Sequence, residues 1–149
     1  MGNICRSPAA EGVMRHLVKA AACADAWDID SAGTIGLHAG DSPDSRMTRA
    51  ARDRGIPLEG RARQYRPADP AKFDLILAMD RDNYQDIQGQ GHDHVRLFCE
   101  FCRKHGETEV PDPYYGGEAG FERVLDLLED GCAEILRQWE AGELQPVKP

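Results

Sequence analysis

The stretch Met1-Gly2-Asn3-Ile4-Cys5-Arg6-Ser7-Pro8 is the one around which the rest of the chain is best understood. Its glycine suits a turn, Ser7 suits a helix N-cap, and Pro8 suits the first helical position, where a missing N–H costs nothing. The unpaired N–H groups of that first turn, the positive end of the helix dipole and the guanidinium of Arg6 then face one small volume. The stretch therefore predicts an oxyanion site, most naturally a site for phosphate.

Four motifs downstream add to this turn. They are Val110-Pro-Asp112-Pro-Tyr-Tyr-Gly-Gly117, Ser31-Ala-Gly-Thr34, Ala62-Arg-Gln64 and Phe73-Asp-Leu-Ile-Leu-Ala-Met-Asp80. With the first stretch, they make nearly the whole chain resemble the low-molecular-weight protein tyrosine phosphatases. The resemblance implies a three-layer α/β fold, with a four-stranded parallel sheet flanked by helices. It also implies hydrolysis of phosphotyrosine or aryl phosphates through a cysteinyl-phosphate, with no metal and no other cofactor.

One departure from the family concerns the nucleophile. The phosphate loop of these enzymes reads Cys, five residues, Arg, and counting back from Arg6 reaches the position immediately before Met1. The chain is therefore expected to be N-terminally shortened, without the nucleophilic cysteine and the first strand, and to have negligible turnover. Because that strand is an inner one in the family, its loss is expected to leave a gap between its neighbours. Two explanations remain open: Met1 is an internal methionine of a longer protein that has the cysteine, or the protein has genuinely lost its nucleophile.

The resemblance also implies roles for individual residues. Arg6 and Asp112 are the expected catalytic residues: a guanidinium fork can grip two phosphate oxygens, and a carboxyl can protonate the departing oxygen and then activate water. The expected phosphate-binding residues are Gly2, Asn3, Ile4, Cys5, Arg6 and Ser7, and the expected substrate cleft is made by Leu37, Tyr114 and Tyr115. Some of these residues also have a purely structural interpretation. Arg6 could be an ordinary exposed arginine at a helix start, Ser7 only a cap, Asp112 a turn residue, and Tyr114 and Tyr115 half-buried loop side chains. Ser31 is expected to support the phosphate loop, and Asp80 is expected near the strand ends, but both residues could also be purely structural.

The five cysteines are odd in number and scattered, which favours reduced thiols over a disulfide framework. Cys5 adjoins Arg6 directly and is not expected to be the nucleophile, although its place at a positive helix end predicts some thiolate character. Cys99 and Cys102 have the spacing of a redox or half-metal motif, but a single pair favours two half-buried thiols. His92 and His94 lie in a polar segment and are expected to be solvated.

Length and charge limit the function further. A chain of 149 residues predicts one domain over residues 1–149. Its net charge of −8 argues against a nucleic-acid or anionic-membrane surface, and no apolar run reaches the length of a membrane span. The chain is expected to be cytoplasmic. Its expected partners are a phosphotyrosine protein or a small aryl phosphate, with inorganic phosphate or sulfate as a ligand; the oligomeric state stays open.

The apolar periodicity predicts strands alternating with helices. The expected helices run from Pro8 to Ala24, from Asp44 or Ser45 to a stop at Gly55 and Pro57, from Arg81 to Ile87 and from Phe121 to Trp139, and the expected strands are Trp27 to Ser31, Phe73 to Met79 and Val95 to Phe98. The segment from Phe101 to Glu118 is expected to be mostly loop.

Two alternatives to a phosphatase remain. One is a non-catalytic phosphate- or phosphotyrosine-binding module, which would bind phosphate without hydrolysis. The other is an arsenate reductase of the same fold, which needs a relay of cysteines near the loop; none follows Met79 and Asp80.

Overall fold

A computed structural model describes residues 5–88, 94–113 and 117–144 of the chain. The described elements are α1 (Arg6–Ala20), η1 (Ala24–Ala26), α2 (Ser45–Arg52), α3 (Asp69–Lys72), β1 (Ile76–Ala78), α4 (Arg81–Gln88), β2 (Val95–Leu97), η2 (Phe98–Phe101) and α5 (Glu118–Glu140). None of the described helices is long and apolar enough to serve as a membrane span.

The sheet is parallel, as predicted. β1 pairs with β2 in the register Ile76 with Val95, Leu77 with Arg96 and Ala78 with Leu97. The helix α4 supplies the crossover between the two strands, which is the usual way to connect parallel neighbours. A separate parallel bridge joins Gly33 to Gln64.

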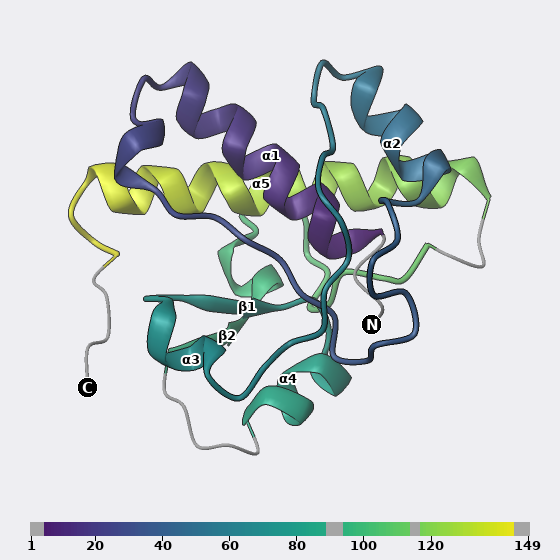
Figure 1. The fold of residues 1–149 in the computed structure, drawn as a ribbon. Coiled ribbons are helices and arrows are strands. Elements are labelled where there is room, and N and C mark those ends of the chain that lie inside the picture. The colour runs from purple at the N-terminus through teal and green to yellow at the C-terminus, as the bar shows by residue number, and fades with distance from the viewer. Residues whose placement is uncertain (1–4, 89–93, 114–116, 145–149) are drawn as a thin grey trace.

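Helices cover the two faces of this sheet and make three layers. Figure 1 shows α1 and α5 on one side of β1 and β2, and α4 on the other. The larger apolar core lies between α1, α2, α5 and η2 and includes the fully buried side chains of Val13, Met47, Phe98 and Leu128. A smaller cluster of Ala78, Ile87 and Val95 packs under α4. The three-layer α/β expectation is confirmed, but within the described residues the sheet has two strands and not the expected four.

The segment from Trp27 to Ser31 is not a strand, so that prediction is wrong. Its backbone is extended at Trp27 (φ −121°, ψ 133°), but it has no described ladder partner. A cavity of about 210 Å³ is lined by this segment and by Phe73, Leu75 and Leu77 on the β1 side. An extended segment whose neighbour across the sheet is a cavity has nothing with which to form a ladder.

Two buried polar atoms lie at this cavity. Among the described residues, Trp27 Nε1 and Tyr65 Oη have no hydrogen-bond partner, and both residues line the cavity. Burial and the nearby charge of Asp69 raise the pKa of the Tyr65 hydroxyl. Unpaired buried polar groups are uncommon and destabilising.

Of the helix ends predicted from the sequence, some are confirmed and others are wrong. α1 begins at Arg6 with Cys5 at its N-cap, so the assignment of Ser7 as the cap and Pro8 as the first helical residue is wrong. Pro8 still falls in the first turn, where its missing N–H has no intrahelical acceptor. α2 begins as predicted, because the Asp44 carboxylate accepts from the N–H groups of Arg46 (2.8 Å) and Met47 (3.3 Å). Gly55, at φ +78°, lies just beyond its end.

Candidate active site

Arg6 lies in the first turn of α1 and is 4% exposed. Its Nη1 donates to Asp80 Oδ2 at 2.8 Å and to the carbonyl oxygen of Val110 at 2.8 Å. Its Nη2 lies 4.0 Å from Asp112 Oδ2. One nitrogen of the guanidinium is thus anchored by two acceptors, and the other faces a half-exposed carboxylate.

Asp80 connects three elements at the carboxyl end of β1. Its Oδ2 receives Arg6 from α1, while its Oδ1 accepts from the backbone N–H of Asn83 in the first turn of α4 at 2.8 Å. Burial by itself would raise the pKa of Asp80, but these two donors hold it below its usual value. The sequence placed Asp80 near the strand ends without identifying it as the partner of Arg6.

The loop that carries Asp112 is attached to the same strand end. The N–H of Val110 donates to the carbonyl of Met79 at 2.8 Å, and Met79 directly follows β1. Because the Val110 carbonyl also receives Arg6, one residue fixes the loop to both the sheet and the helix. Asp112 follows two residues later, with 36% of its side chain exposed, so the carboxylate beside Arg6 is open to solvent.

Cys5 is buried, and its thiol is not activated. Burial raises the pKa of Cys5 to about 12, and the negative charges of Asp44 and Asp112 add to this effect. The expected thiolate character is therefore wrong, because desolvation and two carboxylates outweigh the positive helix end. The prediction that Cys5 is not the nucleophile fits this chemistry.

Thr34 and Ser31 each contact a neighbouring helix. The amide of Asn83 in α4 donates to Thr34 Oγ1 at 3.5 Å, close to the Asp80 contact. The hydroxyl of Ser31 donates to Glu11 Oε1 at 2.7 Å. The Ser-Ala-Gly-Thr motif therefore connects α1 with α4.

The remaining predicted site residues either have no contact with Arg6 or Asp112 among the described interactions or lie outside the described residues. Gly2, Asn3, Ile4, Tyr114 and Tyr115 are outside the described residues. Leu37 is 77% exposed in the loop before α2, and Ser7 lines the 210 Å³ cavity.

Cys99 lies within η2, and Cys102 directly follows it. A hydrogen bond between the two thiols lowers the pKa of Cys99 and raises that of Cys102. Cys102 Sγ also lies 3.5 Å from the carbonyl of Leu127 in α5. His94 Nε2 lies 2.7 Å from the carbonyl oxygen of Pro70, and the residue is half-buried, so His94 is partly exposed to solvent; His92 is outside the described residues.

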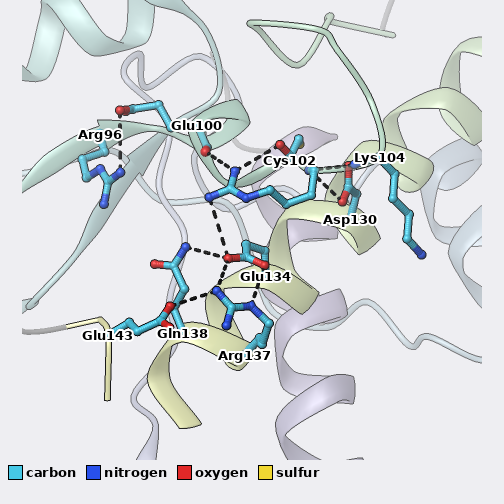
Figure 2. A network of polar contacts seen from close by, with 10 residues as sticks. Arg96, Glu100, Cys102, Lys104, Asp130, Glu134, Arg137, Gln138 and Glu143 are labelled. Atoms are coloured by element: carbon cyan, nitrogen blue, oxygen red, sulfur yellow. Dashed lines mark hydrogen bonds and ion pairs between the residues drawn. The ribbon is translucent and has the colours of Figure 1, made fainter. Parts of the chain in front are cut away.

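A polar network fixes the chain just after this pair. The Asp130 carboxylate accepts from the backbone N–H groups of Arg103, Lys104 and His105 at 2.9 to 3.1 Å. Figure 2 shows Asp130 and Glu134 on α5 turned toward this loop. Burial would raise the pKa of Asp130, but the three N–H donors hold it below its usual value. The network anchors the segment that leads to Val110 and Asp112.

Comparison with known proteins gives a consistent family. The family model for low molecular weight phosphotyrosine protein phosphatase matches residues 1–144. A Synechocystis protein provisionally named a low molecular weight protein-tyrosine-phosphatase is 55% identical over 141 residues, which is 91% of this chain and 90% of that protein. The low molecular weight phosphotyrosine protein phosphatase of Sus scrofa is 36% identical over 143 residues, covering 93% of this chain and 90% of the relative.

A solved structure gives the same result for the fold. The crystal structure of a protein tyrosine phosphatase from Entamoeba histolytica, with Hepes in its active site, superposes with a TM-score of 0.93 at 41% identity. The superposition covers 97% of this chain and 95% of the Entamoeba histolytica chain. On this fold and these matches, the chain belongs to the low molecular weight phosphotyrosine protein phosphatase family.

Proposed function

We propose that the site around Arg6 and Asp112 serves hydrolysis of phosphotyrosine or aryl phosphate monoesters through a cysteinyl-phosphate. The observation that carries this proposal is the 4.0 Å separation of Arg6 Nη2 from Asp112 Oδ2, with Arg6 anchored by Asp80 and Val110. A phosphoryl group bound by Arg6 would therefore lie next to a carboxyl in contact with solvent. A buried guanidinium stabilises the charge on the transferring phosphoryl oxygens.

In the first step, a cysteine thiolate attacks phosphorus and the bond from phosphorus to the ester oxygen breaks. Asp112 gives its proton to that departing oxygen and becomes a carboxylate. In the second step, water attacks the cysteinyl-phosphate, its proton passes to Asp112, and the thiolate leaves as inorganic phosphate is released. Arg6 holds the phosphoryl oxygens in both steps.

The sulfur for this reaction is not supplied by residues 1–149. Cys5 is buried, carries a pKa of about 12 and adjoins Arg6 in sequence, so it cannot occupy the nucleophile's position. The matching position falls immediately before Met1. We therefore propose that the chain of residues 1–149 alone has negligible phosphatase activity.

The test compares two polypeptides on p-nitrophenyl phosphate. One is residues 1–149, and the other is the same chain extended by an apolar strand that ends in a cysteine directly before Met1. The extended chain should turn over the ester and lose that activity when Arg6→Ala or Asp112→Asn is introduced, whereas residues 1–149 should not. Phosphate binding without turnover by the extended chain would instead favour the binding module, and equal turnover by both chains would overturn the missing-nucleophile proposal.

A further inference from the structure

A second hollow lies beside α2, apart from the Arg6 contacts. It has a volume of about 580 Å³ and is bordered by α2, by the segment 42–43 before it and by the segment 58–61 after it. The residues that give it its chemistry are Ser42, Arg49, Arg52, Leu58, Glu59 and Arg61. We refer to it as the α2 groove.

The α2 groove is cationic in an acidic protein. Its charged lining residues are three arginines and Glu59, while the whole chain carries a net charge of −8. Arg49 and Arg52 are both exposed and stand three positions apart on α2, so they share one face of the helix. A locally positive concave surface on a negative protein attracts ligands that carry several negative charges.

Arg61 is held in place within the groove. Its Nη1 donates to Ser42 Oγ at 3.1 Å and to the carbonyl of Gly40 at 3.4 Å. These acceptors are neutral, so they position the guanidinium without cancelling its charge. The groove therefore contains one fixed cation and two that extend from a helix.

The groove adjoins the candidate active site. Asp44 lies between Pro43 and Ser45, which both line the groove, and the charges of Asp44 and Arg46 act on the thiol of Cys5. Figure 1 shows α2 at the same end of α5 as the start of α1, where Arg6 lies. A peptide with one residue at Arg6 could therefore place its neighbouring residues along α2.

We propose that the α2 groove docks an acidic segment of a phosphorylated protein substrate, with Asp or Glu side chains near the phosphotyrosine meeting Arg49, Arg52 and Arg61. This inference rests on the proposed function, because it assigns the substrate class of the same site. Charge complementarity carries it, because three arginines against one glutamate repel a cationic segment and give a neutral segment no ionic contact. The phosphoryl group and the acidic flank are then recognised by different arginines.

The test measures peptide binding to residues 1–149 by fluorescence anisotropy, which requires no turnover. The probes are a labelled unphosphorylated peptide rich in Asp and Glu and its Asn and Gln counterpart. We expect the acidic peptide to bind, with a Kd that rises with salt, and the neutral peptide to bind at least tenfold more weakly. Arg49→Gln with Arg52→Gln should raise the Kd of the acidic peptide by roughly tenfold.

Two control variants isolate the groove. Lys19→Gln with Lys104→Gln removes the same charge from exposed positions on α1 and in the loop after η2, and should leave the Kd unchanged. Arg49→Lys with Arg52→Lys keeps the charge and should restore most of the binding. Circular dichroism of each variant establishes that it is folded.

Several outcomes would overturn the proposal. They are equal binding of the acidic and neutral peptides, an equal loss in the Lys19 and Lys104 control, and tighter binding of a single-stranded oligonucleotide than of the acidic peptide. Concentration-dependent dimerisation that only the Arg49 and Arg52 variant abolishes would assign the groove to a second copy and also overturn it. Because this binding needs no catalysis, failure of docking and failure of the phosphatase proposal give different results.

Discussion

At the scale of single residues, the contact between Arg6 and Asp80 is the one on which the candidate site most depends. A guanidinium that is 4% exposed has little water around it, so its charge is balanced by Asp80 and by the Val110 carbonyl. Asp80 is 20% exposed and serves α4 as well. A change at Asp80 therefore affects both the orientation of Arg6 and the start of α4.

Asp80→Asn should destabilise the protein by about 3 kcal/mol, because it leaves the buried Arg6 guanidinium with only the more distant carboxylate of Asp112, 4.0 Å away. The folded-state pKa of Asp80 is depressed, so its contribution is fully present above the usual aspartate pKa of about 4 and is lost as the pH falls through the lower folded value. Urea denaturation at pH 7 and at pH 3 measures both effects. The variant should lose less stability on acidification than the parent, and parallel losses would contradict the assignment.

Asp130→Asn tests the polar network of Figure 2. The substitution weakens three backbone N–H contacts at a residue that is 7% exposed, and we expect a loss of about 2 kcal/mol in the free energy of unfolding. Asp126→Asn is the matched control on the same helix. Its partner Arg54 keeps Glu122 and Glu129, so the expected loss is below about 1 kcal/mol by thermal denaturation. Equal losses in the two variants would refute the special role of Asp130.

At the scale of elements, α5 depends on a glycine where it crosses η2. A Cβ built on Gly131 would lie 2.4 Å from Phe98 Cε1, and Phe98 is almost fully buried. The absence of a side chain at this position is what lets the 23-residue helix approach the end of the sheet. The pattern of apolar residues predicted α5 but gave no indication of this close approach.

Gly131→Ala should therefore destabilise the protein by about 1–3 kcal/mol, although alanine is the better helix former. Gly120→Ala in the first turn of the same helix is the control, because the nearest atom that a Cβ there would meet among the described residues is Pro113 Cβ, at 3.6 Å. We expect that variant to be neutral or more stable by up to about 1 kcal/mol. Denaturant titration of the pair checks the sign, and a stabilised Gly131→Ala would contradict the packing argument.

At the scale of the whole molecule, the cavity between the segment 27–32 and β1 affects stability as well as shape. At about 24 cal/mol per Å³, a cavity of about 210 Å³ costs up to roughly 5 kcal/mol. This is a large share of the ~5–15 kcal/mol available to a domain. The buried polar atoms of Trp27 and Tyr65 that lack partners in the described structure add to the cost.

A chain extended by an apolar strand before Met1 should therefore melt above residues 1–149, by up to roughly 10–20 °C, since a chain of this size gains roughly 2–4 °C per kcal/mol. Differential scanning calorimetry of both chains measures the shift. The fluorescence of Trp27, which lines the cavity, should change in the same comparison. An unchanged melting temperature would show that the added strand does not occupy this cavity.

Much of the fold could be predicted because short-range patterns specify it. Asp44 caps α2, Arg81 begins α4, and the apolar runs around Ile76 and Val95 pair in parallel as expected. The predictions of a Ser7 cap and of a strand at Trp27 are wrong, because both features depend on information that a local pattern does not contain. α1 begins at Arg6, two residues before the predicted Pro8, with Cys5 as its N-cap, and a strand needs a neighbour that lies elsewhere in the chain.

The sequence by itself determined the family of the chain, its parallel α/β architecture and the two residue types needed to bind and protonate a phosphate ester. These depend on spacing, capping and apolar periodicity, which are local. Only the tertiary structure decided that Asp80 and Val110 anchor Arg6, that Asp112 stands 4.0 Å from it, and that Cys5 is buried with a raised pKa. Those facts depend on burial and on charges brought together from distant parts of the chain, and folding alone creates both.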